Sequence, residues 1–254
     1  MEGFIKFVGT GGARIVASKQ VRSTGGLWVH YKNTNLYIDP GPGALVRIHA
    51  SGDRLEPSRL DGIVLTHKHL DHANDVNVLI EAMAEGGFKK RGELFCPGDA
   101  LADDPVVLKY VRAYLDAIHV LQPGQSYALK DISFSVPVRH IHPVEAYGLI
   151  FHLNKRVGLI ADTRYFDELP DHYKVDILII NVLRVKPILS GDPIDHLSVE
   201  DFKRIVARVR PEKAIMTHLG MNIIKERPAE IAKELERELG VNVVAAYDGM
   251  RLVF

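Results

Sequence analysis

Short apolar runs rich in Val, Ile, Leu and Tyr recur along the whole chain, and this repetition is the feature that most constrains its fold. Each run has about the length of a β-strand, and turn residues separate many of the runs. We predict strands at residues 4–9, 27–31, 35–39, 62–66, 93–97, 132–138, 146–153, 157–162, 175–181, 213–217 and 241–247, with a last strand at 250–254. Sheets with this many strands bury their apolar side chains against another layer. The pattern therefore predicts an α/β or α+β architecture with layered sheets.

Helical signals lie between the strands. The segment 198–209 opens with Ser198 and has Asp201 three residues later, as in a capping box, and its apolar residues follow helical spacing. We predict helices at residues 75–87, 105–117, 198–209 and 227–239. No low-complexity linker divides the chain. We therefore expect residues 1–254 to form a single domain with a helical insert around residues 73–130.

The two halves of the chain share a short pattern. An apolar strand ending in Asp occurs as "LYIDP" (36–40) and as "LIADT" (159–163), and a strand ending in Thr-His occurs as "IVLTH" (63–67) and as "AIMTH" (214–218). Two similar half-units that face each other would bring four strand ends together. Chance similarity between short apolar strings is the alternative interpretation.

The segment "THKHLDH" (66–72) places three histidines and an aspartate directly after an apolar strand. Imidazole nitrogens and carboxylate oxygens are ligands of Zn²⁺ and similar ions. His67 and His69 lie two residues apart, so an extended backbone directs both rings the same way. Asp71 and His72 follow where the chain turns toward a helix, and this spacing favours two adjacent metal ions. A solvated, histidine-rich turn is the alternative.

Further residues of the same chemical types follow strands in the second half of the chain. They are His140, His142, Asp162 and His218. Each of them alone is compatible with an ordinary core or surface residue. Their occurrence after three different strands favours a shared metal site.

The motifs resemble those of the metallo-β-lactamase superfamily, in the same order and over nearly the whole chain. "THKHLDH" is similar to the metal-binding signature of that superfamily, and Asp39 resembles its first motif. "HPVEAYG" (142–148), "LIADT" and "AIMTH" resemble the motifs that follow. The resemblance implies a four-layer αββα sandwich with its metal ions at one edge, between the two sheets.

The resemblance also implies a role for each ligand. It assigns His67, His69 and His142 to one metal ion, Asp71, His72 and His218 to the other, and Asp162 to a bridging position. Asp39 would orient a ligand imidazole, and His140 competes with His142 for its role. We expect two divalent ions, with zinc as the metal and manganese or iron as alternatives, because the same ligands bind all three.

The implied activity is metal-dependent hydrolysis. A hydroxide that bridges the metal ions would be the nucleophile, and Asp71 would orient it or accept its proton. His196 resembles an additional histidine of the phosphodiesterase branch, which includes tRNA 3′-processing endonucleases and cyclic phosphodiesterases of phosphonate breakdown. It would contact a phosphoryl oxygen and protonate the leaving alkoxide; a surface histidine is the alternative. We expect a phosphodiesterase for a small or nucleotide-like ester. The alternatives are carboxylic-ester, lactone or thioester hydrolysis and tRNA 3′-end cleavage.

Composition restricts the partners. Lys plus Arg and Asp plus Glu number 32 each, so no overall charge attracts nucleic acid, and a small-molecule phosphodiester is favoured over RNA. The single cysteine, Cys96, rules out an intramolecular disulfide. We see no signal peptide or membrane-spanning run. We therefore expect a cytoplasmic protein without a membrane partner, and a homodimer is the expected oligomer.

Overall fold

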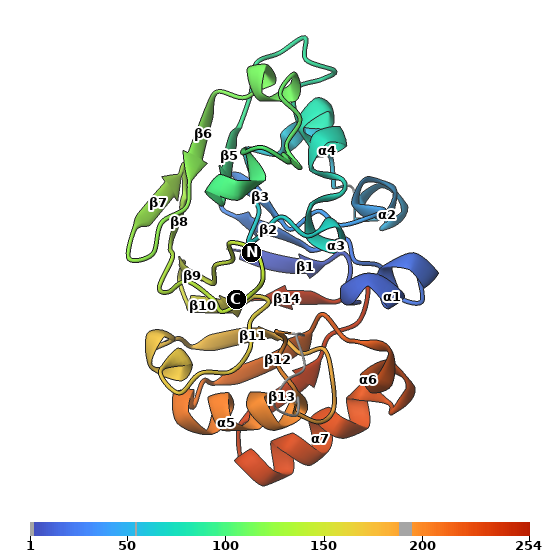
Figure 1. Ribbon diagram of the computed structural model, residues 1–254, viewed down its shortest axis with the longest axis vertical. Helices are drawn as coiled ribbons and strands as arrows, with labels where there is room; N and C mark the ends of the chain where they lie inside the picture. The colour runs from blue at the N-terminus through green and yellow to red at the C-terminus, as the bar shows by residue number, and fades with distance from the viewer. Residues whose placement is uncertain (1–2, 54, 188–194) are drawn as a thin grey trace.

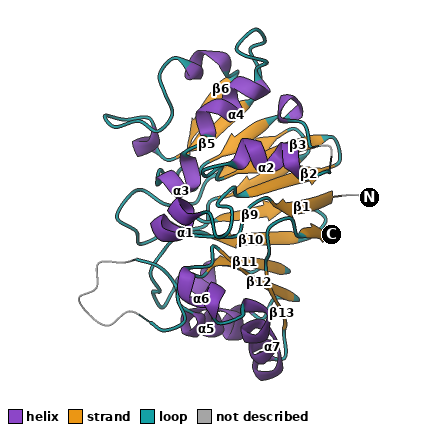
Figure 2. Cartoon of the chain, turned by 90° about the vertical axis from the view of Figure 1, so that its right-hand side faces the viewer, coloured by secondary structure: helices purple, strands orange, loops and turns teal. Residues whose placement is uncertain are grey.

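The computed structural model of the protein describes residues 3–53, 55–187 and 195–254. Two sheets of seven strands each pack face to face, and helices cover their outer sides (Figures 1 and 2). The layers are therefore α, β, β and α, which confirms the predicted four-layer sandwich. Among the described residues, we find no helix with the length and apolar character needed to span a membrane.

The first sheet has the strand order β14-β1-β2-β3-β4-β5-β6. Its strands are β1 (Gly3–Phe7), β2 (Leu27–Tyr31), β3 (Thr34–Ile38), β4 (Gly62–Val64), β5 (Glu93–Cys96), β6 (Ala117–Val120) and β14 (Arg251–Val253). The pairs from β14 to β3 are antiparallel. The pairs from β3 to β6 are parallel, so these four strands end at one edge of the sheet.

The second sheet has the strand order β13-β12-β11-β10-β9-β8-β7. Its strands are β7 (Ser126–Leu129), β8 (Ile132–Ser135), β9 (Leu149–His152), β10 (Arg156–Ile160), β11 (Ile177–Asn181), β12 (Lys213–Thr217) and β13 (Asn242–Ala245). The pairs from β7 to β10 are antiparallel and those from β10 to β13 are parallel. Both sheets thus contain three antiparallel pairs followed by three parallel pairs, which supports the proposal of two similar halves.

The equivalence of the two sheets matches only part of the repeated sequence pattern. β3 and β10 occupy equivalent positions, and Asp39 and Asp162 follow them. β4, which precedes His67, corresponds to β11, whereas His218 follows β12, the counterpart of β5. The two Thr-His pairs are therefore not at equivalent positions.

The helices lie in the connections between strands. They are α1 (Ala13–Lys19), α2 (Ala44–Ala50), α3 (Leu70–Ala73), α4 (Val76–Met83), α5 (Val199–Val209), α6 (Met221–Lys225) and α7 (Pro228–Leu239), with 3₁₀ turns at η1 (Pro57–Arg59), η2 (Gly98–Ala100), η3 (Val111–Tyr114) and η4 (Leu169–His172). The predicted capping box of α5 is confirmed. The Ser198 hydroxyl accepts the N–H of Asp201, and the Asp201 carboxylate accepts the N–H of Ser198.

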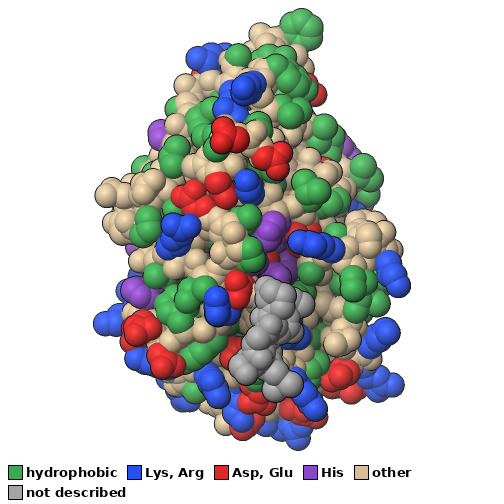
Figure 3. All heavy atoms as spheres, viewed as in Figure 1, with side chains coloured by type: hydrophobic (Ala, Val, Ile, Leu, Met, Phe, Trp, Pro, Cys, Tyr) green, Lys and Arg blue, Asp and Glu red, His purple; other side chains and the backbone are tan. Residues whose placement is uncertain are grey.

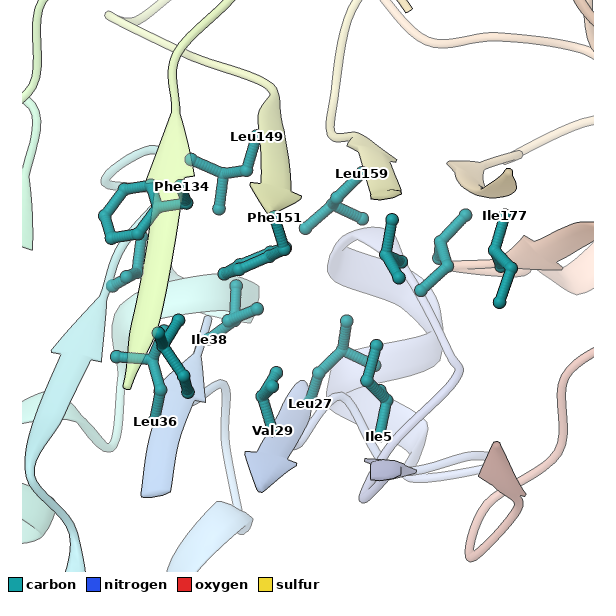
Figure 4. Close-up of a cluster of buried hydrophobic side chains, with 14 of the residues drawn as sticks. Ile5, Leu27, Val29, Leu36, Ile38, Phe134, Leu149, Phe151, Leu159 and Ile177 are labelled. Carbon is teal, nitrogen blue, oxygen red and sulfur yellow. The ribbon is translucent and has the colours of Figure 1, made fainter. Parts of the chain in front are cut away.

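Apolar side chains fill the space between the two sheets (Figure 4). Ile5, Val29 and Leu36 from the first sheet point toward Phe134 and Phe151 from the second. Full burial of a large apolar side chain contributes about 1.5–3 kcal/mol relative to exposure. This core therefore holds the two sheets together and fixes how their strand ends face each other.

The outer helices bury their apolar sides against the sheets. Leu79 and Ile80 of α4 belong to a core cluster on the outer side of the first sheet, and Phe202 and Ile205 of α5 belong to a cluster on the outer side of the second. The parallel strands are thus covered on both faces, as their continuous apolar sequences require. The loops after these strands remain free to carry polar side chains.

The helix predicted over residues 105–117 is wrong. The structure has only the 3₁₀ turn η3 and the first residue of β6 there. Backbone N–H and C=O groups of this segment form hydrogen bonds with side chains, whereas in a helix these groups would bond to each other. The Asn77 carboxamide donates to the Val106 carbonyl and accepts the Leu108 N–H, and the Arg112 guanidinium donates to a nearby carbonyl. Residues 73–130, expected to be a helical insert, contain α4 together with β5, β6 and β7.

Candidate metal centre

The histidine-rich segment follows β4, at the edge where the parallel strands end. His67 is fully buried, and His69 is the N-cap residue of α3. α3 then carries Asp71 and His72. Figure 3 shows histidine side chains gathered in the middle of one face of the molecule. The sequence pattern thus becomes a strand end followed by a short helix, and both contribute metal-type ligands.

His142 joins His67 and His69 from the loop between β8 and β9. Its Nε2 lies 3.0 Å from Nδ1 of His69. The ring centroid of His67 lies 5.0 Å from the centroids of both His69 and His142. Nδ1 of His142 donates to the carbonyl oxygen of Asp195 at 3.0 Å, so its Nε2 presents a lone pair. These three imidazoles form the first ligand group, which could hold a metal ion.

Asp71, His72, Asp162 and His218 form the second ligand group. Nε2 of His72 lies 2.9 Å from Nε2 of His218, which lies 3.2 Å from Oδ2 of Asp71. Two nitrogens bound at about 2.0–2.1 Å to one tetrahedral zinc ion would be about 3.3 Å apart. The nitrogen pairs in the two groups are 2.9 and 3.0 Å apart, which is close to the spacing of ligands that share an ion.

Asp162 belongs to the second group and also faces the first. Its Oδ2 is 3.6 Å from Nε2 of His67 in the first group. The same oxygen is 3.4 Å from Nε2 of His72 and 3.5 Å from Nε2 of His218 in the second group. Oδ1 accepts a hydrogen bond from the Asn181 carboxamide at 2.8 Å. One fixed carboxylate oxygen therefore faces imidazoles of both groups, as a residue that bridges two metal ions would.

Asp39 fixes the orientation of His72. Its Oδ2 accepts hydrogen bonds from Nδ1 of His72 at 3.0 Å and from the Thr66 hydroxyl at 2.6 Å. Because Nδ1 donates to Asp39, Nε2 of His72 is the ring nitrogen that faces the second group. Asp39 and His218 have φ angles of +53° and +56°. Such backbone conformations cost about 1–3 kcal/mol each for non-glycine residues and cluster at functional sites.

His140 contributes no atom to either ligand group among the described residues. Its Nε2 lies 2.9 Å from the Tyr173 hydroxyl, and burial lowers the pKa of the imidazole to about 3. The structure therefore brings His142, and not His140, to the other histidines. His140 is a buried neutral side chain beneath the site.

The donor set fits divalent metal ions. Nε2 of His67 is buried and has no hydrogen-bond partner in the part of the chain that the structure describes. Burial lowers the pKa of His67, so its imidazole is neutral and able to bind a cation. Burial also acts to lower the pKa of His72, but the carboxylates of Asp162, Asp71 and Asp39 outweigh it and raise that pKa. A metal ion would replace the proton that these carboxylates attract.

His196 lies beside Asp162 at the start of the segment that leads to α5. Its Nδ1 is 3.4 Å from Oδ2 of Asp162, and its ring stacks on that of His218 with centroids 5.6 Å apart. Burial lowers the pKa of His196 to about 4, so the ring is neutral at pH 7. Arg164 pairs with the Asp195 carboxylate at 3.0 Å and so helps to hold this segment.

Two partners of the ligands were missed by sequence reasoning. Asn181 binds Asp162, and it ends the apolar strand β11 as a polar residue, which is the same signal that pointed to Asp162 itself. The carbonyl of Asp195 binds His142, and no sequence signal predicts this because every residue has a carbonyl.

Comparison with known proteins identifies the family. Residues 34–219 match the model of the β-lactamase superfamily domain. The chain belongs to the metallo-β-lactamase superfamily. This confirms the resemblance drawn from the motifs, and the chain is a metal-dependent hydrolase of that superfamily.

Relatives cover nearly the full length of the chain. The protein MJ1374 of Methanocaldococcus jannaschii is 30% identical over 263 residues, which cover 98% of this chain and 94% of MJ1374. The crystal structure of the metallo-β-lactamase fold protein YhfI from Bacillus subtilis matches with a TM-score of 0.78 and 19% identity, over 99% of both chains. A diphosphatase of the PhnP family matches with a TM-score of 0.73 and 21% identity, over 99% of this chain and 98% of the other. These structures share the fold of this chain.

Cys96 is expected to be chemically inert. It is fully buried in β5, and burial raises the pKa of its thiol to about 12. An unfolded chain ionises its thiol near pH 8.5. The folded protein therefore keeps the proton at that pH, and this thiol destabilises the fold as pH rises above the unfolded value. We expect iodoacetamide at about pH 8.5 to leave the native protein unmodified while it alkylates the unfolded chain. Mass spectrometry measures both rates, and equal rates would contradict the burial of Cys96.

Proposed function

We propose that the protein is a dinuclear metal-dependent phosphodiesterase for a small or nucleotide-like ester. The observation that carries the proposal is the place of His196, 3.4 Å from the carboxylate of Asp162 that faces both ligand groups. The leaving group of an alkyl phosphodiester is an alkoxide, which is a poor leaving group. A histidine at the site would donate a proton to that alkoxide. The similarity to a diphosphatase of the PhnP family supports a phosphorus ester as substrate.

The two ligand groups would each hold one divalent ion, with zinc as the expected metal and manganese or iron as alternatives. When bound, the ions would lower the pKa of a water to about 7 and polarise a phosphoryl oxygen. Asp71 would orient the attacking water. Burial acts to raise the pKa of Asp71, but His72 and His218 outweigh it and hold that pKa below its usual range. The carboxylate is therefore a weak base, which favours orientation over proton transfer.

His196 would protonate the leaving alkoxide. Its low pKa, about 4, keeps the ring neutral before substrate binds. A nearby negative charge raises the pKa of an imidazole. The anion of a bound phosphodiester would therefore favour protonation of His196 at the moment when the acid is needed.

A pocket of about 520 Å³ opens beside the first ligand group, where His69 forms part of its wall. The other lining residues are Lys68, Leu70, Ala73, Asn74, Asn77, Asp104, Pro105 and Val106. Pockets for small ligands commonly measure about 300–1,000 Å³. The pocket is large enough for one arm of a nucleotide-like diester.

The proposal is tested by turnover of bis(p-nitrophenyl) phosphate. We expect release of p-nitrophenolate by protein loaded with zinc or manganese, loss of turnover after treatment with a chelator, and recovery when the metal is restored. A carboxylic ester with the same leaving group, p-nitrophenyl acetate, is the comparison substrate. No phosphodiester turnover with zinc, manganese or iron would contradict the proposal, and faster turnover of the acetate would favour a carboxylic-ester hydrolase.

A further inference from the structure

The glycine-rich loop at residues 9–13 lies alongside the segment that carries His218. The N–H of Leu219 donates to the Thr10 carbonyl at 2.8 Å, and the N–H of Gly12 donates to the Leu219 carbonyl at 3.2 Å. Gly11 and Leu219 form a parallel bridge. The loop is therefore joined through backbone hydrogen bonds to the residue that directly follows a candidate metal ligand.

The same loop touches two members of the second ligand group. The N–H of Ala13 donates to Oδ2 of Asp71 at 2.8 Å, the oxygen that also faces Nε2 of His218. Gly12 packs against the imidazole of His218, where an added Cβ would lie only 2.1 Å from Nδ1. Gly12 has φ −137°, a conformation open to any residue, so the need for glycine comes from this contact and not from the backbone. Within the described residues, no hydrogen bond of the loop reaches the first ligand group.

Asp248 holds this loop from the far end of the chain. Its Oδ1 accepts the N–H of Thr10 at 2.9 Å and the Thr10 hydroxyl at 2.7 Å. Its Oδ2 accepts the N–H of Ser23 at 2.8 Å. Thr10 and Ser23 are at most 1% exposed and Asp248 is half-buried, so these charge-assisted hydrogen bonds are partly shielded from water. One carboxylate thus fixes both ends of the segment that contains the loop and α1.

We propose that Asp248 and Gly12 are positioning residues for the second ligand group. Asp248 fixes the loop, and the loop places the Ala13 N–H on Asp71 and the Gly12 backbone against His218. The inference rests on the proposed function, in which this group holds one of two metal ions. It goes further because it treats the two ions differently: the loop and Asp248 position ligands of the second ion and not those of the first.

The replacement Asp248→Asn tests the proposal, because it keeps the size of the side chain but removes the charge and one of its acceptors. Loss of a partner that orients a ligand typically weakens metal binding about 10- to 100-fold. We expect titration of metal-free protein with zinc against a chromophoric chelator to show weaker binding of one ion, by about tenfold or more, and unchanged binding of the other. Asp131→Asn is the matched control. Asp131 lies between β7 and β8. It accepts hydrogen bonds from the N–H of Asn33, in the turn between β2 and β3, and from the hydroxyl of Thr34, the first residue of β3. We expect this control to bind both ions like the wild type.

A second variant, Gly12→Ala, reaches His218 directly and is examined without metal. We expect the ¹⁵N and ¹H NMR signals of the His218 imidazole to shift in Gly12→Ala and Asp248→Asn, while those of His67 stay in place. Equal weakening of both ions or unchanged zinc binding in Asp248→Asn would overturn the proposal, and so would unshifted His218 signals in the two variants. A wild-type protein that binds no zinc would instead overturn the proposed function, and the metal-free NMR comparison would still decide the role of the loop.

Discussion

Replacing His196 by Ala is expected to lower kcat for an alkyl phosphodiester by about 10²- to 10⁴-fold, the usual contribution of a positioned general acid. The reason is geometric, since Nδ1 of His196 lies 3.4 Å from Oδ2 of Asp162 and His196 belongs to neither ligand group. An alkoxide needs a proton as it leaves, whereas p-nitrophenolate does not. The loss should therefore be much smaller for bis(p-nitrophenyl) phosphate than for methyl or nucleoside diesters.

The control for this variant is His152→Ala. His152 is an exposed histidine at the end of β9. In the sheet it lies opposite Arg156, the first residue of β10, whereas Asp162 follows the last residue of β10, so His152 lies at the end of the strands away from the site. We expect this variant to keep wild-type turnover of both substrates. Zinc content should be the same in all three proteins. If kcat of His196→Ala for alkyl diesters falls by less than about threefold, His196 is not the general acid. Carboxylic-ester hydrolysis would then become the favoured activity.

Replacing Asp162 by Asn is expected to weaken the binding of both metal ions and to reduce turnover to background. Oδ2 of Asp162 lies within 3.6 Å of Nε2 of His67 and of His72, which belong to different ligand groups. Loss of an outer partner costs about 10- to 100-fold in metal affinity, and loss of a shared ligand should cost more. Elemental analysis after gel filtration in metal-free buffer measures the content, and a zinc titration measures the affinities.

The matched control is Asp176→Asn, which lies near the other edge of the same sheet and accepts the backbone N–H of Arg156. We expect the control to retain both ions and full turnover. Two ions bound with wild-type affinity in Asp162→Asn would show that Asp162 does not bridge them. The loss of one ion alone would assign Asp162 to a single group.

Much of the site was predictable because its ligands follow apolar strands. Apolar runs mark buried parallel strands, and polar residues at their ends lie at one edge of a sheet, so Asp39, His67, Asp162 and His218 could be placed together before the fold was known. The resemblance of the motifs to those of the metallo-β-lactamase superfamily then implied the αββα sandwich. His142 could not be separated from His140 by this argument, because both follow β8 and the loop that carries them determines which one reaches His69.

The remaining features depend on contacts between distant segments. β6 and β7 escape prediction because most of their side chains are only partly buried, so their apolar patterns are weak. The segment 105–117 shows helical periodicity, yet Asn77 and Arg112 bind its backbone groups and prevent a helix. The support of the site by Asp248 joins residues 238 positions apart, and no local pattern encodes it.

The most direct test of the account is a crystal structure of the zinc-loaded protein with anomalous data recorded at the zinc edge. We expect two anomalous peaks about 3.5–4 Å apart. One should lie among His67, His69 and His142, the other among Asp71, His72 and His218, with Asp162 in contact with both. A single peak, or peaks away from these side chains, would contradict the dinuclear centre on which the proposed activity depends.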